Sequence, residues 1–457
     1  MAILIQQASY VVRSADRIER DADVLIEGRR IAAVGRVAPV GQIAPDDMSD
    51  LQVIDGRGRA VIPGLVNAHT HLYQSFLKGL SDDVGLVDWC NATLYPMAYA
   101  IHRAHWGRHD ETGGYHWASL SALEMIRGGV TCCIDMNMNM DSVFHAWRDS
   151  GMRGVGAIAL SDRWLPAPLR SYQETMVADA LRLAREWHGV HPRLDTVLAP
   201  STPFLCTREL LLWARDRAQE IGIGLQIHLA ETRYEVEQVL RETGLTPVAY
   251  AHSLGLLKAG TNAVHCVHVT DAEIDLLAES GATVVHCPKS NLKLGSGIAP
   301  VTKMLRRGVP VALAADGAAS NDLLDMFEET RMAALLHKGA SEDPTAITGR
   351  QAFRMATEGG ARAAGIDAGA IDPGKLADLA IINLDQPHLM PLHDVINTLV
   401  YCAKSSDVET TIIDGQLVML DRQILTLDEE KTRHEAARYG GELYRQGVEM
   451  WRDIAPG

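Results

Sequence analysis

The stretch from Val61 to His71, Val-Ile-Pro-Gly-Leu-Val-Asn-Ala-His-Thr-His, constrains the fold more than any other part of the chain. Its apolar run is typical of a buried β-strand, and its two histidines stand where such a strand would end. Side chains at positions i and i+2 of a strand point to the same face, so His69 and His71 can reach one metal ion together. Neutral imidazole is a favoured ligand for zinc and for iron. The same stretch is also compatible with two polar residues in a loop after a strand. Other parts of the chain have to decide between a metal site and such a loop.

Apolar strand patterns and helical patterns alternate through the middle of the chain. We expect strands at 61–68, 129–135, 153–160, 194–200, 222–229, 261–267, 281–287 and 309–316. Helical patterns lie between them, for example over 111–127 and 207–221. Eight strands separated by helices predict an α/β fold with a closed parallel (β/α)8 TIM barrel, whose active site lies at the carboxyl ends of the strands. A doubly wound sheet is the main alternative, but no Gly-x-Gly-x-x-Gly follows any of these strands.

Short strand patterns occupy both ends of the chain. They lie at 24–34, 52–58, 376–384 and 410–419, the last as a hairpin around Asp414-Gly415. We therefore predict a small β-sandwich domain built from both chain ends, with the barrel inserted in it. The predicted boundaries are 1–58 for the first part of the sandwich, 59–370 for the barrel, 371–425 for the second part and 426–457 for a C-terminal helix.

Composition and charge exclude several classes of protein. The net charge is −15, from 58 acidic and 43 basic residues, which disfavours a nucleic-acid partner. No apolar stretch reaches the roughly 18 residues of a membrane-spanning helix, and the start of the chain lacks the features of a signal peptide. The seven cysteines form no Cys-x-x-Cys pair, which indicates a reduced protein. We expect a cytoplasmic homo-oligomer that binds neither nucleic acid nor membrane.

Further polar residues follow other predicted strands at the same end of the barrel. The fifth strand carries His228, with Glu231 three residues later, the sixth carries His265 and the eighth carries Asp316. Three histidines and one aspartate make a nitrogen and oxygen site suited to a catalytic divalent ion with an open position for water. The predicted ligands are His69, His71, His228 and Asp316.

Five motifs together show a resemblance to the amidohydrolase superfamily. They are Pro-Gly-Leu-Val-Asn-Ala-His-Thr-His at 63–71, His-Leu-Ala-Glu-Thr at 228–232, Val-His-Cys-Val-His at 264–268, His-Cys-Pro-Lys-Ser-Asn-Leu-Lys-Leu-Gly-Ser-Gly at 286–297 and Ala-Asp-Gly-Ala-Ala-Ser-Asn-Asp at 315–322. Within it, the chain resembles the metal-dependent branch of heterocycle deaminases and chlorohydrolases. This branch includes triazine hydrolases, guanine and 8-oxoguanine deaminases, and methylthioadenosine/S-adenosylhomocysteine deaminases. The resemblance implies hydrolytic displacement of an amine, or of chloride, from an aromatic N-heterocycle.

The resemblance also bears on the metal. Binuclear relatives of such barrels bridge two ions with a modified lysine on the fourth strand, but residues 196–201 contain no lysine. We therefore expect one divalent ion, zinc, with iron as the alternative. A different class of enzyme, a cyclic-amide hydrolase, would usually require the two bridged ions.

Residue chemistry assigns roles to the remaining polar groups. Asp316 can take the proton of a metal-activated water, and Glu231 can give a proton to a ring nitrogen and later to the leaving amine. His265 can orient the nucleophile or stabilise developing charge. Structural alternatives stay open: a helix N-cap for Asp316, a first-turn helix residue for Glu231 and a buried core histidine for His265. We assign His268 and His286 supporting positions around the site.

Three residues are expected to contact the substrate. Gln74 resembles the glutamine of triazine hydrolases and guanine-type deaminases, whose amide can read the edge of a ring as donor and acceptor. Trp89 matches a tryptophan of the methylthioadenosine/S-adenosylhomocysteine branch and can stack on a flat ring, with simple packing as the alternative. Ser201 stands where that branch carries a histidine.

Other positions depart from the nucleoside-binding pattern. Ala98 stands where the branch carries a ribose-binding glutamate, Ile158 stands where it carries an arginine, and Asp162-Arg163 resembles atrazine chlorohydrolase-like chains. The departures predict a flat amino-substituted N-heterocycle without a sugar as substrate, such as a triazine, an oxidised purine or a pterin. A methylthioadenosine/S-adenosylhomocysteine (adenosine-derivative) deaminase is the alternative.

Overall fold

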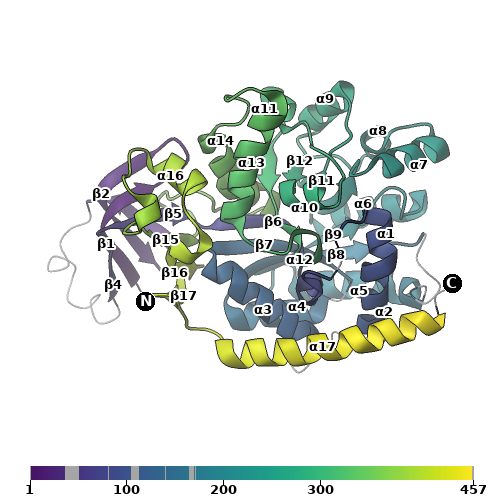
Figure 1. The fold of residues 1–457 in the computed structure, drawn as a ribbon, viewed down its shortest axis with the longest axis horizontal. Helices are drawn as coiled ribbons and strands as arrows, with labels where there is room; N and C mark the ends of the chain where they lie inside the picture. Colours follow the sequence, from purple (N-terminus) through teal and green to yellow (C-terminus); the bar gives the residue numbers. More distant parts are fainter. Residues whose placement is uncertain are drawn as a thin grey trace.

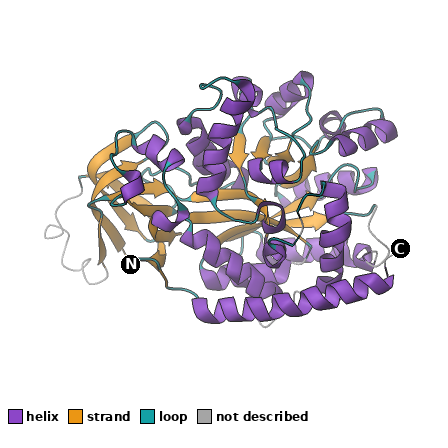
Figure 2. Ribbon diagram, in the orientation of Figure 1, coloured by secondary structure: helices purple, strands orange, loops and turns teal. Residues whose placement is uncertain are grey.

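The strands of the chain are gathered into two sheets. The computed structural model describes residues 2–36, 51–80, 82–103, 113–138, 140–163, 169 and 171–454. One sheet is parallel and lies in the middle of the molecule, with helices around it, while the other is built from both chain ends and lies to one side (Figures 1 and 2). This arrangement confirms the predicted α/β barrel with a small β domain.

The parallel sheet closes on itself. Its strands are β6 (Leu65–His71), β7 (Val130–Asn137), β8 (Arg153–Leu160), β9 (Leu194–Pro200), β10 (Leu225–Leu229), β11 (Thr261–His265), β12 (Thr283–His286), β13 (Val311–Leu313) and β14 (Asp316–Gly317). The short strands β13 and β14 are two pieces of the eighth predicted strand. Because β13 pairs with β12 while β14 pairs with β6, this strand joins the two edges of the sheet and completes the barrel.

The helices between the strands begin and end at residues with a clear physical reason. The predicted helices at 111–127 and 207–221 are α3 (Gly113–Arg127) and α6 (Arg208–Ile221). The Thr207 side chain accepts a hydrogen bond from the Leu210 N–H, so it caps the start of α6, and Gly222 ends the helix at a positive φ of 86°. The others are α4 (Met140–Ser150), α5 (Ser171–Trp187), α7 (Arg233–Thr243), α8 (Pro247–Ser253), α9 (Asp271–Ser280), α10 (Pro288–Lys293), α11 (Val301–Arg306), α12 (Ala318–Asn321), α13 (Met326–Ser341), α14 (Gly349–Arg354) and α15 (Gly360–Ala364), with a π-helical turn, η6 (Met355–Gly359), between the last two.

An additional helical segment follows β6 and rises over the end of the barrel that carries the histidines. It consists of η3 (Leu72–Leu77), α1 (Leu86–Trp89), η4 (Cys90–Leu94) and α2 (Tyr95–Arg103). The C-terminal helix α17 (Glu429–Ile454), predicted over 426–457, packs on the outside against α2 and α3 (Figure 1). Within the described residues, no helix is long and apolar enough to cross a membrane.

The sheet at the side joins the first and the last parts of the chain. It contains β1 (Ala2–Val12), β2 (Ile18–Glu27), β3 (Arg30–Gly35), β4 (Leu51–Asp55), β5 (Arg59–Pro63), β15 (Leu379–Asn383), β16 (Val408–Ile413), β17 (Gln416–Leu420) and β18 (Gln423–Ile424). The antiparallel pairing of β5 with β15 connects the two chain ends. Since β5 belongs to this sheet, its pairing favours a boundary between the end sheet and the barrel after Pro63, whereas the sequence predicted it after residue 58. The division of the chain into four parts stays a prediction.

The predicted hairpin around Asp414-Gly415 connects β16 to β17. Both residues have positive φ, 56° and 73°, as a two-residue hairpin turn requires. A Cβ atom on Gly415 would lie 1.9 Å from the carbonyl oxygen of Gly28, so only glycine fits here.

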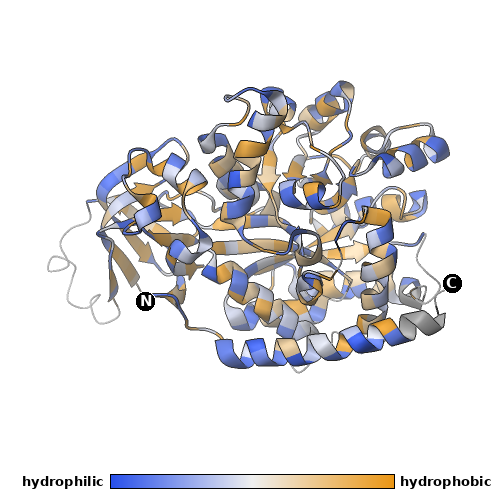
Figure 3. Ribbon diagram, in the orientation of Figure 1, coloured by the Kyte–Doolittle hydropathy of each residue, from blue (hydrophilic) through white to orange (hydrophobic). Residues whose placement is uncertain are grey.

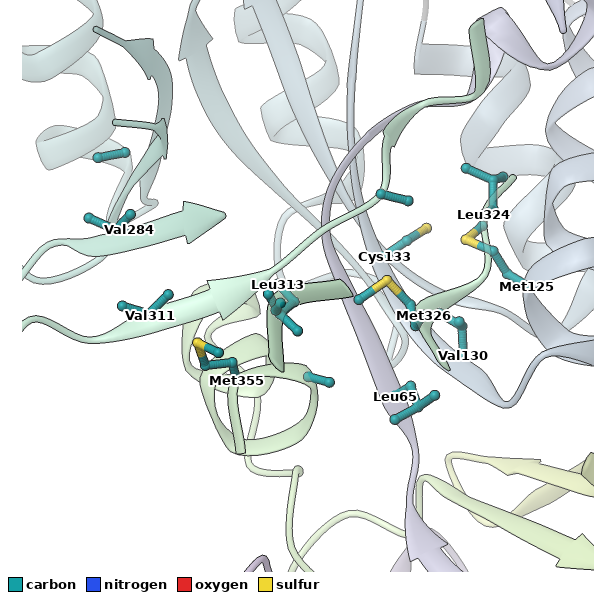
Figure 4. Packing of buried hydrophobic residues seen from close by; sticks show 14 of the residues in the cluster. Leu65, Met125, Val130, Cys133, Val284, Val311, Leu313, Leu324, Met326 and Met355 are labelled. Carbon is teal, nitrogen blue, oxygen red and sulfur yellow. The ribbon is translucent and has the colours of Figure 1, made fainter. Parts of the chain in front are cut away.

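Apolar side chains fill the space between the barrel strands and their helices. Figure 3 shows hydrophobic residues concentrated on the central strands and hydrophilic residues on outer helices such as α17. In Figure 4, Leu65 of β6 and Cys133 of β7 pack close to Met326 at the start of α13, and all three are buried. This core fixes the strands from which the site residues project.

A buried ion-pair network ties the barrel to the end sheet. Arg153, at the start of β8, contacts Asp378 through Nε (2.6 Å) and Nη2 (3.0 Å), and Asp414 through Nη2 (2.8 Å). The three side chains are between 2% and 4% exposed. Burial alone would lower the pKa of the Arg153 guanidinium, but the charge and hydrogen bonds of Asp378 and Asp414 raise it above its ordinary value.

Replacing Arg153 with alanine is expected to lower the free energy of unfolding by about 3–5 kcal/mol, because two buried carboxylates lose their counter-ion. Arg29 provides the matched control. It also contacts Asp414, at 2.8 Å, but is 51% exposed, so Arg29→Ala should cost less than about 1 kcal/mol. Urea unfolding of the three proteins measures the difference. An equal loss of unfolding free energy in the two variants would contradict a special role for the buried ion-pair network.

Candidate active site

Five predicted site residues meet at the carboxyl ends of the barrel strands. His69 and His71 end β6, His228 lies on β10, His265 ends β11 and Asp316 begins β14. The Nε2 atoms of His69 and His228 are 3.2 Å apart. Asp316 Oδ1 lies 3.3 Å from His69 Nε2 and 3.5 Å from His71 Nε2. The structure thus brings together the four predicted ligands, with His265 beside them.

The ring orientation of the three predicted histidine ligands is fixed from behind. Each Nδ1 faces an oxygen acceptor: His69 Nδ1 lies 2.9 Å from Gln226 Oε1, His71 Nδ1 lies 2.7 Å from the Met136 carbonyl oxygen, and His228 Nδ1 lies 2.8 Å from the Ser201 carbonyl oxygen. An acceptor at Nδ1 requires the hydrogen to be on that atom. The Nε2 lone pairs of all three rings therefore point toward the common centre.

This donor set fits a divalent cation. Burial and the neighbouring imidazoles lower the pKa of His71 to about 4 and that of His228 well below its usual range, so both rings are neutral. Two lone pairs that face each other across 3.2 Å, as at His69 and His228, repel unless a cation lies between them. Nitrogen lone pairs with one carboxylate oxygen are the ligands that zinc and similar ions take in catalytic sites.

Asp316 is held as an ionised carboxylate. Its Oδ2 accepts a hydrogen bond from Ser290 Oγ at 2.6 Å, and its Oδ1 accepts one from the Gly317 N–H at 2.8 Å. Burial alone would raise its pKa, but the neighbouring imidazoles of His69, His265 and His71 hold it well below its usual range. The alternative role as a helix N-cap does not apply, because Gly317 occupies that position before α12.

Glu231 lies next to this centre and retains its proton. Its Oε2 is 3.5 Å from His265 Nε2 and its Oε1 is 3.5 Å from Ser296 Oγ. Burial, and to a smaller extent the charge of Asp316, raise the pKa of the Glu231 carboxyl to about 8. At neutral pH the group is therefore mostly an acid that can donate a proton.

Glu231 is also not a residue of the first turn of α7. Thr232 caps that helix, and the acidic residue of its first turn is Glu235. Glu235 accepts hydrogen bonds from the N–H groups of Ala230 and Glu231, at 3.0 and 2.9 Å. It therefore fixes the backbone that presents Glu231 to the site.

Several site residues have an unusual backbone conformation. Ala230, His265, Cys266 and Asp316 have φ between 47° and 71°, the left-handed region that non-glycine residues avoid. All four lie toward the carboxyl end of the barrel, Asp316 at the start of β14 and the others at or just after the ends of β10 and β11, so the strain is located where side chains must be aimed at the centre.

A cavity of about 430 Å³ opens onto these groups. Most of its wall is apolar, and the three predicted substrate residues Gln74, Trp89 and Ser201 all line it. Gln74 lies against Gly317, where a Cβ atom would come within 1.8 Å of Gln74 Oε1. Trp89 is 4% exposed. A cavity of this size and lining is suited to a flat heterocyclic ligand.

Three further residues with a predicted bearing on the substrate lie in different surroundings. Ala98 lines the cavity, whereas Ile158 is buried in the barrel wall and is not among the residues that face the cavity. Arg163 pairs with Glu242 at 2.6 Å instead.

The two histidines expected in supporting positions lie at different places. His268 Nε2 donates to the Ser296 carbonyl oxygen at 2.8 Å, and the Ser296 hydroxyl in turn contacts Glu231. His286 is buried, with its Nε2 3.1 Å from His337 Nε2 on α13.

With the geometry established, comparison with known proteins identifies the family. The sequence model of the Amidohydrolase family matches residues 60–418. This chain belongs to the amidohydrolase family. The match covers the barrel together with strands of the end sheet, and it includes every residue of the site described above.

Relatives with an assigned activity are similar to this chain over most of their length. The 5-methylthioadenosine/S-adenosylhomocysteine deaminase of Thermococcus sibiricus is 40% identical over 426 residues, covering 92% of this chain and 94% of that protein. The 5'-deoxyadenosine deaminase of Methanothermobacter thermautotrophicus is 42% identical over 407 residues, covering 88% and 90%.

Solved amidohydrolase structures are similar as well. An adenosine deaminase from Xanthomonas campestris with bound zinc has a TM-score of 0.88 and 31% identity, covering 97% of this chain and 98% of that one. An atrazine chlorohydrolase from Arthrobacter aurescens complexed with zinc has a TM-score of 0.87 and 25% identity, covering 96% and 100%.

Two residues of this amidohydrolase were missed as contributors to the site. Ser290 and Asn291 are consecutive residues of α10, and both are buried. Ser290 Oγ donates to Asp316, while Asn291 Oδ1 lies 2.9 Å from His265 Nδ1 and fixes the tautomer of that ring. The motif at 286–297 contains them, and two polar residues a few positions after the buried strand β12 are the signal that could have pointed to this role.

Proposed function

We propose that this amidohydrolase is a hydrolytic deaminase of adenosine derivatives that uses one divalent metal ion, zinc, held by His69, His71, His228 and Asp316. One observation carries the proposal: a neutral imidazole cluster with an ionised carboxylate lies beside a protonated carboxyl, Glu231, at the end of a cavity of about 430 Å³. The names of the 40–42% identical relatives support adenosine derivatives as substrates.

The chemistry requires a nucleophile and a proton donor at the same carbon atom. A divalent ion at this point supplies Lewis acidity, which lowers the pKa of a water molecule toward neutrality. Asp316 is placed to take the proton of that water, because its carboxylate is ionised and buried. Glu231 is placed to give its proton to the ring, and His265, with its Nε2 directed at Glu231, keeps that carboxyl in position.

In the proposed reaction, water adds to the ring carbon that carries the amino group. A C–O bond forms, and the electron pair of the adjacent C=N bond moves to the ring nitrogen, which takes a proton from Glu231. Asp316 takes one proton of the water as the C–O bond forms, and the remaining hydroxyl proton then passes to Glu231, which regains its acid form. The amino group receives the proton held by Asp316. The C–N bond breaks, so that ammonia leaves and a ring carbonyl beside an N–H group remains.

The proposed substrate is an adenosine derivative, which the sequence offered as the alternative, and not the free heterocycle that the sequence departures favoured. Ala98 and Ser201 leave two ribose contacts unfilled relative to the nucleoside-binding pattern. However, Asn91 and Thr202 also line the cavity and can accept or donate hydrogen bonds to sugar hydroxyls. A pocket can therefore bind the same sugar through different side chains. The predicted cytoplasmic location and homo-oligomeric state remain part of this proposal.

A panel of ammonia-release assays tests the substrate. We expect kcat/KM for 5'-deoxyadenosine and methylthioadenosine to exceed that for guanine, 8-oxoguanine, isoxanthopterin and melamine by at least about tenfold. A substrate without the sugar leaves the buried polar groups that bind sugar hydroxyls without hydrogen-bond partners, which weakens its binding. The Glu231→Gln variant, purified in parallel, excludes a contaminating deaminase. If a free heterocycle is the best substrate, the sequence departures at Ala98 and Ser201 were the better guide.

A further inference from the structure

A second cavity of about 300 Å³ adjoins the active-site cavity. The two share the wall residues Leu86 and Val87 around α1, Thr232 and Tyr234 around the start of α7, and Leu294 after α10. Val87 and Tyr234 are exposed, so the shared wall lies at the mouth of the active site. A substrate that extends out of the first cavity therefore meets the second one.

The second cavity carries a basic side chain, which the first one lacks. Among the described residues that line the active-site cavity there is no lysine and no arginine. The second cavity is lined by Arg233, Asp88 and His268. Neither Arg233 nor Asp88 forms an ion pair with another described residue, so a positive and a negative side chain border the same space without a protein partner.

The second cavity is also linked to the reacting groups. Ser296 lines it, and the Ser296 hydroxyl is 3.5 Å from Glu231 Oε1. His268 donates to the Ser296 carbonyl oxygen, and Arg233 follows Glu231 by two residues. One extended ligand can therefore contact Arg233 at one end and place its ring at Glu231.

We propose that this second cavity binds the zwitterionic end of an adenosine thioether whose 5' substituent ends in an α-amino acid, as in S-adenosylhomocysteine. Arg233 takes the carboxylate and Asp88 takes the ammonium group. The assignment rests on the proposed function. A guanidinium binds a carboxylate through two parallel hydrogen bonds, and an unpaired aspartate on the wall of the same cavity matches the second charge of an amino acid.

Adenosine derivatives with short 5' substituents do not need this cavity. In 5'-deoxyadenosine the 5' carbon carries only hydrogen, and in methylthioadenosine the substituent is uncharged and short. Their binding depends on the apolar first cavity alone. Arg233 and Asp88 therefore determine specificity between substrates and take no part in the chemical step.

The test compares kcat/KM for S-adenosylhomocysteine and 5'-deoxyadenosine in the wild type and in Arg233→Met. We expect kcat/KM for S-adenosylhomocysteine to fall at least about tenfold, mainly through KM, because the lost contact is made equally in the ground state and the transition state. The value for 5'-deoxyadenosine should stay within about twofold. Arg241→Met is the matched control, since Arg241 is an exposed arginine of the same helix that lines neither cavity.

A second pair of measurements separates the two charges. Asp88→Asn should reduce kcat/KM for S-adenosylhomocysteine but not for an adenosine thioether that keeps the carboxylate and lacks the amine. Equal effects of Arg233→Met on both nucleosides, or no effect on either, would overturn the assignment. A wild-type enzyme that deaminates the free heterocycles but none of the adenosine derivatives would overturn the proposed function and this assignment with it.

Discussion

Replacing Glu231 with glutamine is expected to lower kcat by roughly two to four orders of magnitude while the metal stays bound. The amide has the size of the acid but cannot give up a proton to the ring nitrogen. Metal content measured by plasma emission and ammonia release measured on the same preparation separate the two effects. Loss of the metal would make Glu231 a ligand or a structural residue, and near-normal turnover would remove it from the mechanism.

The surroundings of Glu231 explain why this effect should be large. Glu231 is 6% exposed and the pKa of its carboxyl is raised to about 8, so few water molecules can replace it as a proton donor. Glu237→Gln is the matched control, because Glu237 is exposed on the outer side of α7 and lines neither cavity. That variant should retain the activity of the wild type.

The sequence predicted the barrel because its signals are local and repeated. Each strand is an apolar run, several of them with a polar residue at or near the carboxyl end, and each run lies within a few residues of a strand in the structure. The eighth strand is the exception in detail: it is broken after Leu313 and resumes at Asp316, which has a positive φ of 60°. A left-handed aspartate leaves no mark in the sequence, since glycine is the residue that usually signals this conformation.

The sequence predicted the side chains that form the site, but not the backbone groups that hold them in place. Met136 and Ser201 hold the rings of His71 and His228 through their carbonyl oxygens, and a carbonyl oxygen is present at every residue, so no sequence pattern marks this use. Ser201 illustrates the point, because its side chain was expected to face the substrate while its backbone holds a histidine. Ser290 reaches Asp316 because the closed barrel brings together two residues that lie 26 positions apart in the sequence.

The metal prediction has the largest expected effect. His71→Ala and His228→Ala should each lose both the bound ion and measurable turnover, because each removes one of three imidazole nitrogens whose lone pairs converge on one point. Wild-type protein purified without chelator should contain about one ion per chain, measured by plasma emission. His252→Ala is the matched control, since His252 is an exposed histidine of α8 outside the site, and it should keep the ion and the activity.

Two outcomes would contradict the single-ion site. A content near two ions per chain at full activity would require a second set of ligands, which the lysine-free strand β9 does not offer in the bridging position. Full metal retention in His228→Ala would mean that the ion lies elsewhere. In that case the short distance of 3.2 Å between the Nε2 atoms of His69 and His228 would need another explanation.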